Sequence, residues 1–382
     1  MHMRRSSSVP YHHTGKTPAE SPATTRRIPG DLSELPALLD ELSEALFASF
    51  PRRDQRRKGR LYLDGLLTTH GRKSIRRMAY GRGGTALEQR LQHFITASTW
   101  PWTPVRAALA AQLERAAPAA AHVVQLLSIP RSGDQSVGIA HRYDPHRGQA
   151  YRGQQAIGVW HTTARLSAPV HWRLLLPGEP VAPDTPDGPP AAETIQDCAA
   201  AAALEATRLT GRPVPVILDL PGTCAGTALD RLTEAGLPTL VRADARAPAV
   251  IADPALPGYA ARSLSAWRIL ALRGGLRHRG TAAGAGVRVT LPHGSGEPLY
   301  LFGSADASRQ LWFANAHAET GGSPGALAER VRQDLTRVGA HAGLRDFEGR
   351  SFAGWHRHIT LASAAHAAAV LALQQRTTQH AA

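Results

Sequence analysis

The 382-residue sequence predicts a two-part protein, with a small all-α domain followed by a larger mixed α/β domain. Two observations predict this fold class. Apolar residues recur at helical spacing up to about residue 116, and beyond it short apolar runs alternate with helical patterns. The hydrophobic content of 43% is typical of a globular protein and argues against a disordered one.

The segment before the helical domain, residues 1–30, is polar and rich in Ser, Thr, Pro and Arg. It lacks the apolar centre of a signal peptide, and no apolar run in the chain reaches the roughly 18 residues of a membrane span. We therefore expect a disordered basic tail, no membrane partner and a cytoplasmic protein.

The expected helical domain covers residues 31–116. Asp31 and Glu34 form a capping-box pattern that opens an amphipathic helix over 32–49. Further helices are predicted over 53–68, from a second capping box at Thr85-Ala86-Leu87-Glu88, and from Thr103 as cap with Pro104 at the first helical position.

The larger domain, residues 117–376, starts with predicted strands over 122–129, 136–143, 155–163 and 171–176. Helices over 191–210 and 223–235 then alternate with strands over 214–220 and 238–243. Residues 245–320 are rich in Gly and Pro and contain short strand candidates, so we interpret them as a β insertion. Helices over 323–342 and 351–375 close the domain. This order fits an RNase H-like mixed sheet, although periodicity alone also allows other α/β folds.

The chain is strongly basic, with 44 Lys and Arg against 30 acidic residues, a net charge of +14 and a pI near 10.8. This balance favours a polyanionic partner, nucleic acid first, although a general bias toward Arg would also produce it. Two cysteines exclude a disulfide framework and a cysteine-based zinc site.

The positive charge is concentrated in the helical domain. Arg52, Arg56 and Arg60 are four residues apart and share one helical face beside an apolar one. Such a face can lie along phosphates, and the alternative is an ordinary solvated surface. The candidate DNA-binding residues of this domain are Arg52, Arg53, Arg56, Arg57, Lys58, Arg60, Arg72, Lys73, Arg76 and Arg77.

Three segments carry a resemblance to a known family. The run from Gly343 to Leu361, GLRDFEGRSFAGWHRHITL, resembles the segment after the catalytic glutamate helix in DDE-type transposases of bacterial insertion sequences. The run Tyr62–Leu67 followed by Arg72-Lys73-Ser74, and Ser136-Val137-Gly138, resemble further landmarks of that family. The resemblance implies a helical DNA-binding domain, an RNase H-like domain with a β insertion, double-stranded DNA as partner and a homodimer. It also suggests DNA contacts for Arg350 and Arg357.

The same resemblance locates the three carboxylates that hold two magnesium ions in such enzymes. Gln125 and Leu126 stand at the first acid position, Asp219 at the second and Arg332 at the third. Of these residues, only Asp219 carries the negative charge that holds a hard cation, so we interpret it as a vestigial catalytic residue. The alternative for Asp219 is a turn residue at the end of a strand.

The leading hypothesis is a transposase-derived, nuclease-inactive protein that binds duplex DNA as a site-specific regulator or architectural factor, associated with the nucleoid and without a cofactor or metal. The alternative is an active DDE transposase, in which displaced acids such as Asp134 and Glu329 complete a magnesium site with Asp219. A third possibility is a decayed gene product that binds DNA through charge alone.

Overall fold

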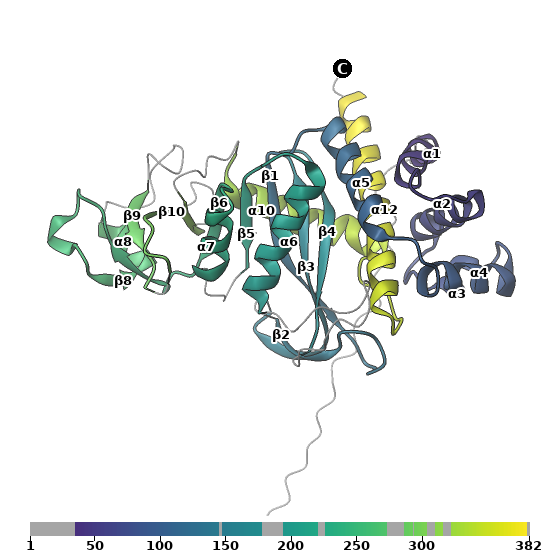
Figure 1. The fold of residues 1–382 in the computed structure, drawn as a ribbon, viewed down its shortest axis with the longest axis horizontal. Helices are drawn as coiled ribbons and strands as arrows, with labels where there is room; N and C mark the ends of the chain where they lie inside the picture. The colour runs from purple at the N-terminus through teal and green to yellow at the C-terminus, as the bar shows by residue number, and fades with distance from the viewer. Residues whose placement is uncertain are drawn as a thin grey trace, which may run out of the picture.

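The computed structural model describes residues 35–144, 147–177, 194–220, 226–272, 286–292, 294–303, 310–315 and 322–379 (Figure 1). The predicted disordered tail, residues 1–30, lies outside these residues. No helix in the described part of the chain is long and apolar enough to cross a membrane.

The chain begins with a group of helices, at the right of Figure 1. They are α1 (Leu35–Leu46), α2 (Arg53–Thr68), α3 (Ile75–Ala79), α4 (Gly84–Thr96) and α5 (Trp102–Ala116). The helix predicted over 53–68 has the same bounds in the structure. Two predicted caps are wrong, because α4 and α5 begin two residues earlier than predicted and place Thr85 and Thr103 inside the first turn. Gly83 and the extended Pro101 precede these helices instead.

A mixed sheet follows the helices. Its first strands are β1 (Ala121–Pro130), β2 (Ala140–Asp144), β3 (Gln149–Thr162), β4 (Ser167–Leu175), β5 (Val216–Asp219) and β6 (Thr239–Ala243). Strand β3 pairs antiparallel with β1, β2 and β4, whereas β5 pairs parallel with β1 and β6. The central order is therefore β4-β3-β1-β5-β6, which confirms the predicted RNase H-like mixed sheet.

The predicted β insertion extends this sheet beyond β6. Its elements are β7 (Pro248–Ile251), β8 (Ser263–Ser265), α8 (Ala266–Leu272), β9 (Val287–Thr290), β10 (Leu299–Gly303) and β11 (Leu311–Ala314). Strand β11 pairs antiparallel with β6, so the insertion continues the sheet to the left of Figure 1. The sequence did not predict β7, β8 and α8, because elements of three to seven residues show too few periods of a pattern.

Helices cover both faces of the central sheet. They are α6 (Ile195–Thr210), α7 (Gly226–Glu234), α10 (Pro324–Asp334), α11 (Ala340–Ala342) and α12 (Phe352–Gln379), with a π-helical turn between α10 and α11 at Leu335–Gly339. Val123 and Leu127 of β1 join the core that contains α12, whereas Val124 and Leu126 join the core that contains α6. This alternation assigns each residue of β1 to one face of the sheet.

The helical region and the sheet share one apolar core. Helix α12 packs against α1, α2, α4 and α5 as well as against β4. Its alanines belong to the same cluster of buried residues as Leu46, Leu63 and Trp160. The two parts therefore share a common core. The domain boundary near residue 116 stays a prediction.

Candidate active site

The candidate site is built around Asp219, the last residue of β5. The side chain is fully buried, with 0% exposure, although it stands at the end of a strand. Strand β1 runs parallel to β5 in a register that sets Gln125 opposite Asp219. The two residues that the family resemblance places at the first and second acid positions are therefore neighbours in the sheet.

Both carboxylate oxygens of Asp219 accept hydrogen bonds from nitrogen donors. Arg332 Nη1 donates to Oδ2 at 2.6 Å, and Arg242 Nη1 donates to Oδ1 at 2.9 Å. Gln125 Nε2 also donates to Oδ2, at 2.8 Å, and to the carbonyl oxygen of Ala328 in α10, at 3.1 Å. Because a carboxylate buried without partners would be very costly, these donors offset the burial of Asp219.

The two arginines reach Asp219 from different elements. Arg242 lies on β6, one position after the residue that pairs with Leu218 of β5, so it stands next to Asp219 in the sheet. Arg332 comes from the last turn of α10 and also binds Glu329, one helical turn earlier, through Nε at 3.0 Å. The cluster therefore joins strands β1, β5 and β6 to helix α10 through charged hydrogen bonds.

These residues do not fit a pair of magnesium ions. Magnesium needs oxygen ligands in octahedral geometry, yet both oxygens of Asp219 are engaged by N–H donors. The guanidinium of Arg332 adds positive charge beside the carboxylate. In the described residues, no three His, Cys, Asp or Glu side chains are grouped so that they could hold a metal ion.

The other residues considered for this site lie elsewhere or have other partners. Leu126 packs on the opposite face of β1, against the core that contains α6. Asp134 lies exposed in the segment between β1 and β2, where its Oδ1 accepts from Gln135. Glu329 is half-exposed and binds Arg332 and Gln333. The structure thus brings Gln125, Asp219 and Arg332 together.

Most of the candidate DNA-binding residues are accessible. The exposed ones are Arg52, Arg53, Arg56, Arg57, Arg72, Arg76, Arg77 and Arg350. Lys58 and Arg60 are partly exposed and pair with Asp54 and Asp40, at 3.0 and 2.7 Å. Arg72 forms an ion pair with Glu348, which ties the turn before α3 to the segment before α12.

Two of these candidates are corrected by the structure. Arg357 is 3% exposed, and its guanidinium donates to the carbonyl oxygens of Trp100 and Ile95. Lys73 is 4% exposed, and its ammonium donates to the carbonyl oxygen of Thr69. Burial also lowers the pKa of Lys73. Both side chains hold the helical region against the C-terminal segments and are not available to a phosphate backbone.

Sequence reasoning missed Arg242 as a partner of Asp219. The only signal was a charged residue within the otherwise apolar strand predicted over 238–243. His356 and His358, two residues apart in α12, are both buried. His358 Nδ1 lies 2.8 Å from the Tyr62 hydroxyl, and Nε2 lies 2.9 Å from the Gly343 carbonyl oxygen.

The fold and the position of Asp219 define an RNase H-like protein with its candidate active site at the end of β5, beside the middle of β1. The family profile of the DDE superfamily endonucleases matches residues 45–279, more than half of the chain. The chain belongs to this family. A search of curated proteins finds no match to the chain.

Proposed function

We propose that this member of the DDE superfamily endonucleases is a transposase-derived protein that binds duplex DNA without cleaving it. The observation that carries the proposal is the Arg332 guanidinium, 2.6 Å from Asp219 Oδ2. The family resemblance places Arg332 at the third acid position and Gln125 at the first acid position. A cation and an amide thus replace two ligands at a site that needs negative charge to hold two divalent ions.

Duplex DNA is the proposed partner because exposed arginines gather on the helical region. Arg53 and Arg57 of α2, and Arg76 and Arg77 of α3, are exposed. The apolar face of α2, including Leu63 and Leu66, is fully buried, so the helix is held rigidly. Cationic side chains on a fixed helix can follow phosphates at a defined spacing.

A regulator or architectural factor is the role that fits DNA binding without cleavage. The protein would then act at the nucleoid, and the family resemblance favours a homodimer. The alternative of an active transposase needs Asp134 and Glu329 as metal ligands. Asp134 is hydrogen-bonded to Gln135 on an exposed segment, and Glu329 is paired with Arg332, so the geometry does not favour this alternative.

The proposal is tested by fluorescence anisotropy with labelled duplexes, in which binding is titrated against salt. Replacing both Arg56 and Arg57 by Ala should weaken binding and lower the slope of log affinity against log salt by about 0.9 for each lost phosphate contact. An unchanged slope would remove α2 from the DNA interface. Selected genomic sites that bind no better than random duplexes at moderate salt would favour a decayed protein that binds by charge alone.

A further inference from the structure

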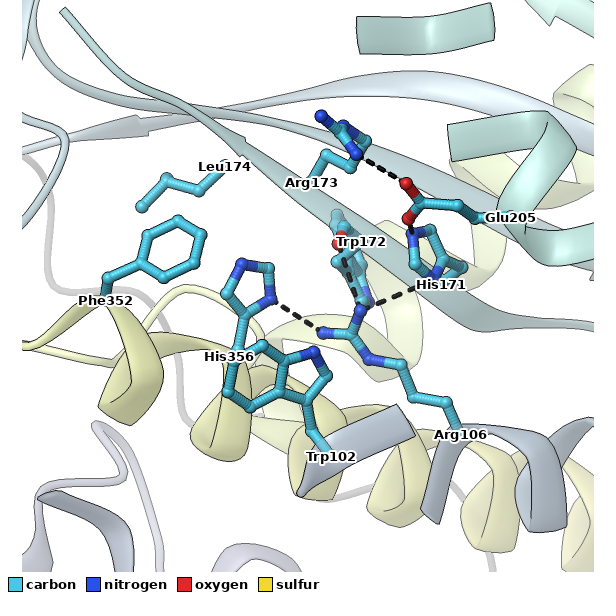
Figure 2. A pocket seen from close by; sticks show the side chains of 9 residues that line it. All are labelled: Trp102, Arg106, His171, Trp172, Arg173, Leu174, Glu205, Phe352 and His356. Atoms are coloured by element: carbon cyan, nitrogen blue, oxygen red, sulfur yellow. Dashed lines mark hydrogen bonds and ion pairs between the residues drawn. The ribbon is translucent and has the colours of Figure 1, made fainter. Parts of the chain in front are cut away.

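A cavity lies between the helical region and the sheet (Figure 2). It is separate from the cluster around Asp219, because none of the residues of that cluster line it. Its volume is about 190 Å³. The lining side chains come from α5, β4, α6 and α12 and are Trp102, Arg106, His171, Trp172, Arg173, Leu174, Glu205, Phe352 and His356. An apolar cavity of about 150 Å³ in another protein accommodates benzene, so this one has room for a single substituted ring.

The floor of the cavity carries a buried cation without a direct carboxylate partner. The Arg106 side chain is 1% exposed. It donates to two oxygens, Thr360 Oγ1 at 2.8 Å and the Trp172 carbonyl oxygen at 3.0 Å. Its other contacts are imidazole nitrogens, His171 Nδ1 at 3.4 Å and His356 Nδ1 at 3.0 Å. All four groups are neutral, because burial lowers the pKa of both histidines, that of His171 to about 4.

The nearest carboxylate is shared with another arginine. Glu205 Oε2 lies 2.7 Å from His171 Nε2, and its Oε1 accepts from Arg173 Nη1 at 2.6 Å. The His171 ring therefore lies between Arg106 and Glu205, and the two charged groups make no direct hydrogen bond. Arg106 carries a formal charge of +1 and makes no hydrogen bond to a carboxylate of the described residues, which favours an anion in the adjacent space.

His356 offers a directed donor to this space. Its Nδ1 faces an arginine, which can only donate, so Nδ1 accepts and the proton of the neutral ring lies on Nε2. The residue is 5% exposed. The hydrogen bond found for its ring within the described residues is on Nδ1, and none is found on Nε2. Figure 2 shows this second nitrogen turned away from Arg106, toward Phe352 and Leu174.

Aromatic and aliphatic side chains complete the cavity. The Trp102 ring stacks on His356, with centroids 4.8 Å apart and an interplanar angle of 13°. Phe352 meets the same imidazole edge to face, at 4.5 Å. Leu174 lies on the other side, as Figure 2 shows. These surfaces suit the faces and edges of a ring, and the polar groups are gathered at the His356 and Arg106 end.

We propose that this cavity binds a small aromatic carboxylate. Its carboxylate accepts the Nε2–H of His356, on the side of the imidazole opposite the Arg106 guanidinium, and its ring lies against Trp102, Phe352 and Leu174. A phosphate ester fits less well, because a dianion would need several donors in a space that is mostly apolar. A neutral ring would leave the charge of Arg106 uncompensated.

The test is isothermal titration of the full-length protein with benzoate, salicylate and nicotinate, each a single ring with one carboxylate. Benzamide serves as the neutral control for benzoate. We expect saturable 1:1 binding of at least one of the three carboxylates. The affinity of benzamide should be at least tenfold weaker than that of the carboxylate that binds best. Tenfold corresponds to about 1.4 kcal/mol. No saturable carboxylate binding, or equal affinity for benzamide, would overturn the proposal, and neither result requires a variant.

Two matched variants locate the site. Leu174→Phe narrows the cavity and leaves the contacts of Arg106 and His356 in place. Leu371→Phe makes the same change at a partly buried position of α12 outside the cavity. Provided that both variants melt cooperatively, binding should be lost in Leu174→Phe and retained in Leu371→Phe. Wild-type affinity in Leu174→Phe would place the ligand elsewhere and overturn the assignment. Because the titration contains no DNA, its outcome is independent of the proposed DNA binding.

Discussion

Arg332 Nη1 lies 2.6 Å from Asp219 Oδ2, which makes an arginine of α10 the partner of the one acid left at the candidate active site. The relationship links a residue on the middle strand of the parallel set β1-β5-β6 to a helix more than a hundred positions later. It makes the carboxylate part of an internal ion pair.

Replacing Asp219 by Ala should destabilise the fold. The change leaves Arg242 and Arg332 without this carboxylate, and Gln125 keeps only the Ala328 carbonyl oxygen as an acceptor. Breaking a fully buried ion pair costs about 3–5 kcal/mol. Both arginine side chains are 27% exposed and can be partly hydrated, so we expect a loss of about 2–3 kcal/mol in urea unfolding. The matched change Asp134→Ala, at an exposed acid, should leave the free energy of unfolding almost unchanged.

Restoring two acids should create a metal site. The double variant Gln125→Asp with Arg332→Glu places three carboxylates around the end of β5. We expect it to bind Mn²⁺ or Mg²⁺ in isothermal titration, whereas the wild type shows no stoichiometric binding. A wild-type protein that binds Mg²⁺ with a stoichiometry lost in Asp219→Asn would contradict this account of the site.

The exposed arginines of α3 should contribute to the DNA interface. Replacing Arg76 and Arg77 by Ala should weaken duplex binding and lower the salt slope by about 2 if each contacts one phosphate. The control pair is Arg115→Ala with Arg208→Ala, at exposed positions of α5 and α6. The slopes of log affinity against log salt are measured by anisotropy. Equal slopes for the two double variants would show that Arg76 and Arg77 make no specific phosphate contacts and contribute only to the total charge.

Stability should fall as the pH is lowered through the range of histidine titration. Burial, together with the charges of His161 and Arg212, lowers the pKa of His122 from 6.5 to about 3. Burial also lowers the pKa values of His171 and His366 to about 4. Between pH 6.5 and these values the unfolded chain binds more protons than the folded one, so the free energy of unfolding decreases with falling pH. Thermal melts at pH 7, 6 and 5 measure the decrease.

One substitution isolates the His122 contribution. Neither ring nitrogen of His122 has a hydrogen-bond partner within the described residues, and the side chain is fully buried. His122→Leu should therefore raise stability at pH 7 by about 1 kcal/mol and flatten its decline toward pH 5. A variant that is less stable and equally pH-sensitive would show that the ring is required for packing.

The sequence predicted the order of elements well where patterns were long. Helix α2 has five leucine and tyrosine positions, and β1 is a ten-residue, mostly apolar run, so both were predicted within one residue. Strands β7 and β8 were missed because they are defined by pairing with each other and by the pairing of β7 with β9, and α8 because seven residues show too few helical periods. Such pairing is a property of the folded sheet and leaves little periodicity in the sequence.

The candidate site shows the same division. Family spacing led to Gln125, Asp219 and Arg332, and the structure places these side chains in one cluster. Arg242 was missed because its role depends on the register between β5 and β6. Lys73 was assigned to DNA from the charge cluster and Arg357 from the family resemblance, but side chains of this length can bury their stems and satisfy backbone carbonyls inside the fold.

Strand cleavage tests the central claim most directly. The purified protein is incubated with end-labelled duplex and with supercoiled DNA, at concentrations that saturate binding, in the presence of Mg²⁺ or Mn²⁺. Asp219→Asn is treated in parallel. The account predicts bound but uncut DNA, with equal and background levels of nicking for the two proteins. Metal-dependent cleavage by the wild type that disappears in Asp219→Asn would contradict it and establish an active endonuclease.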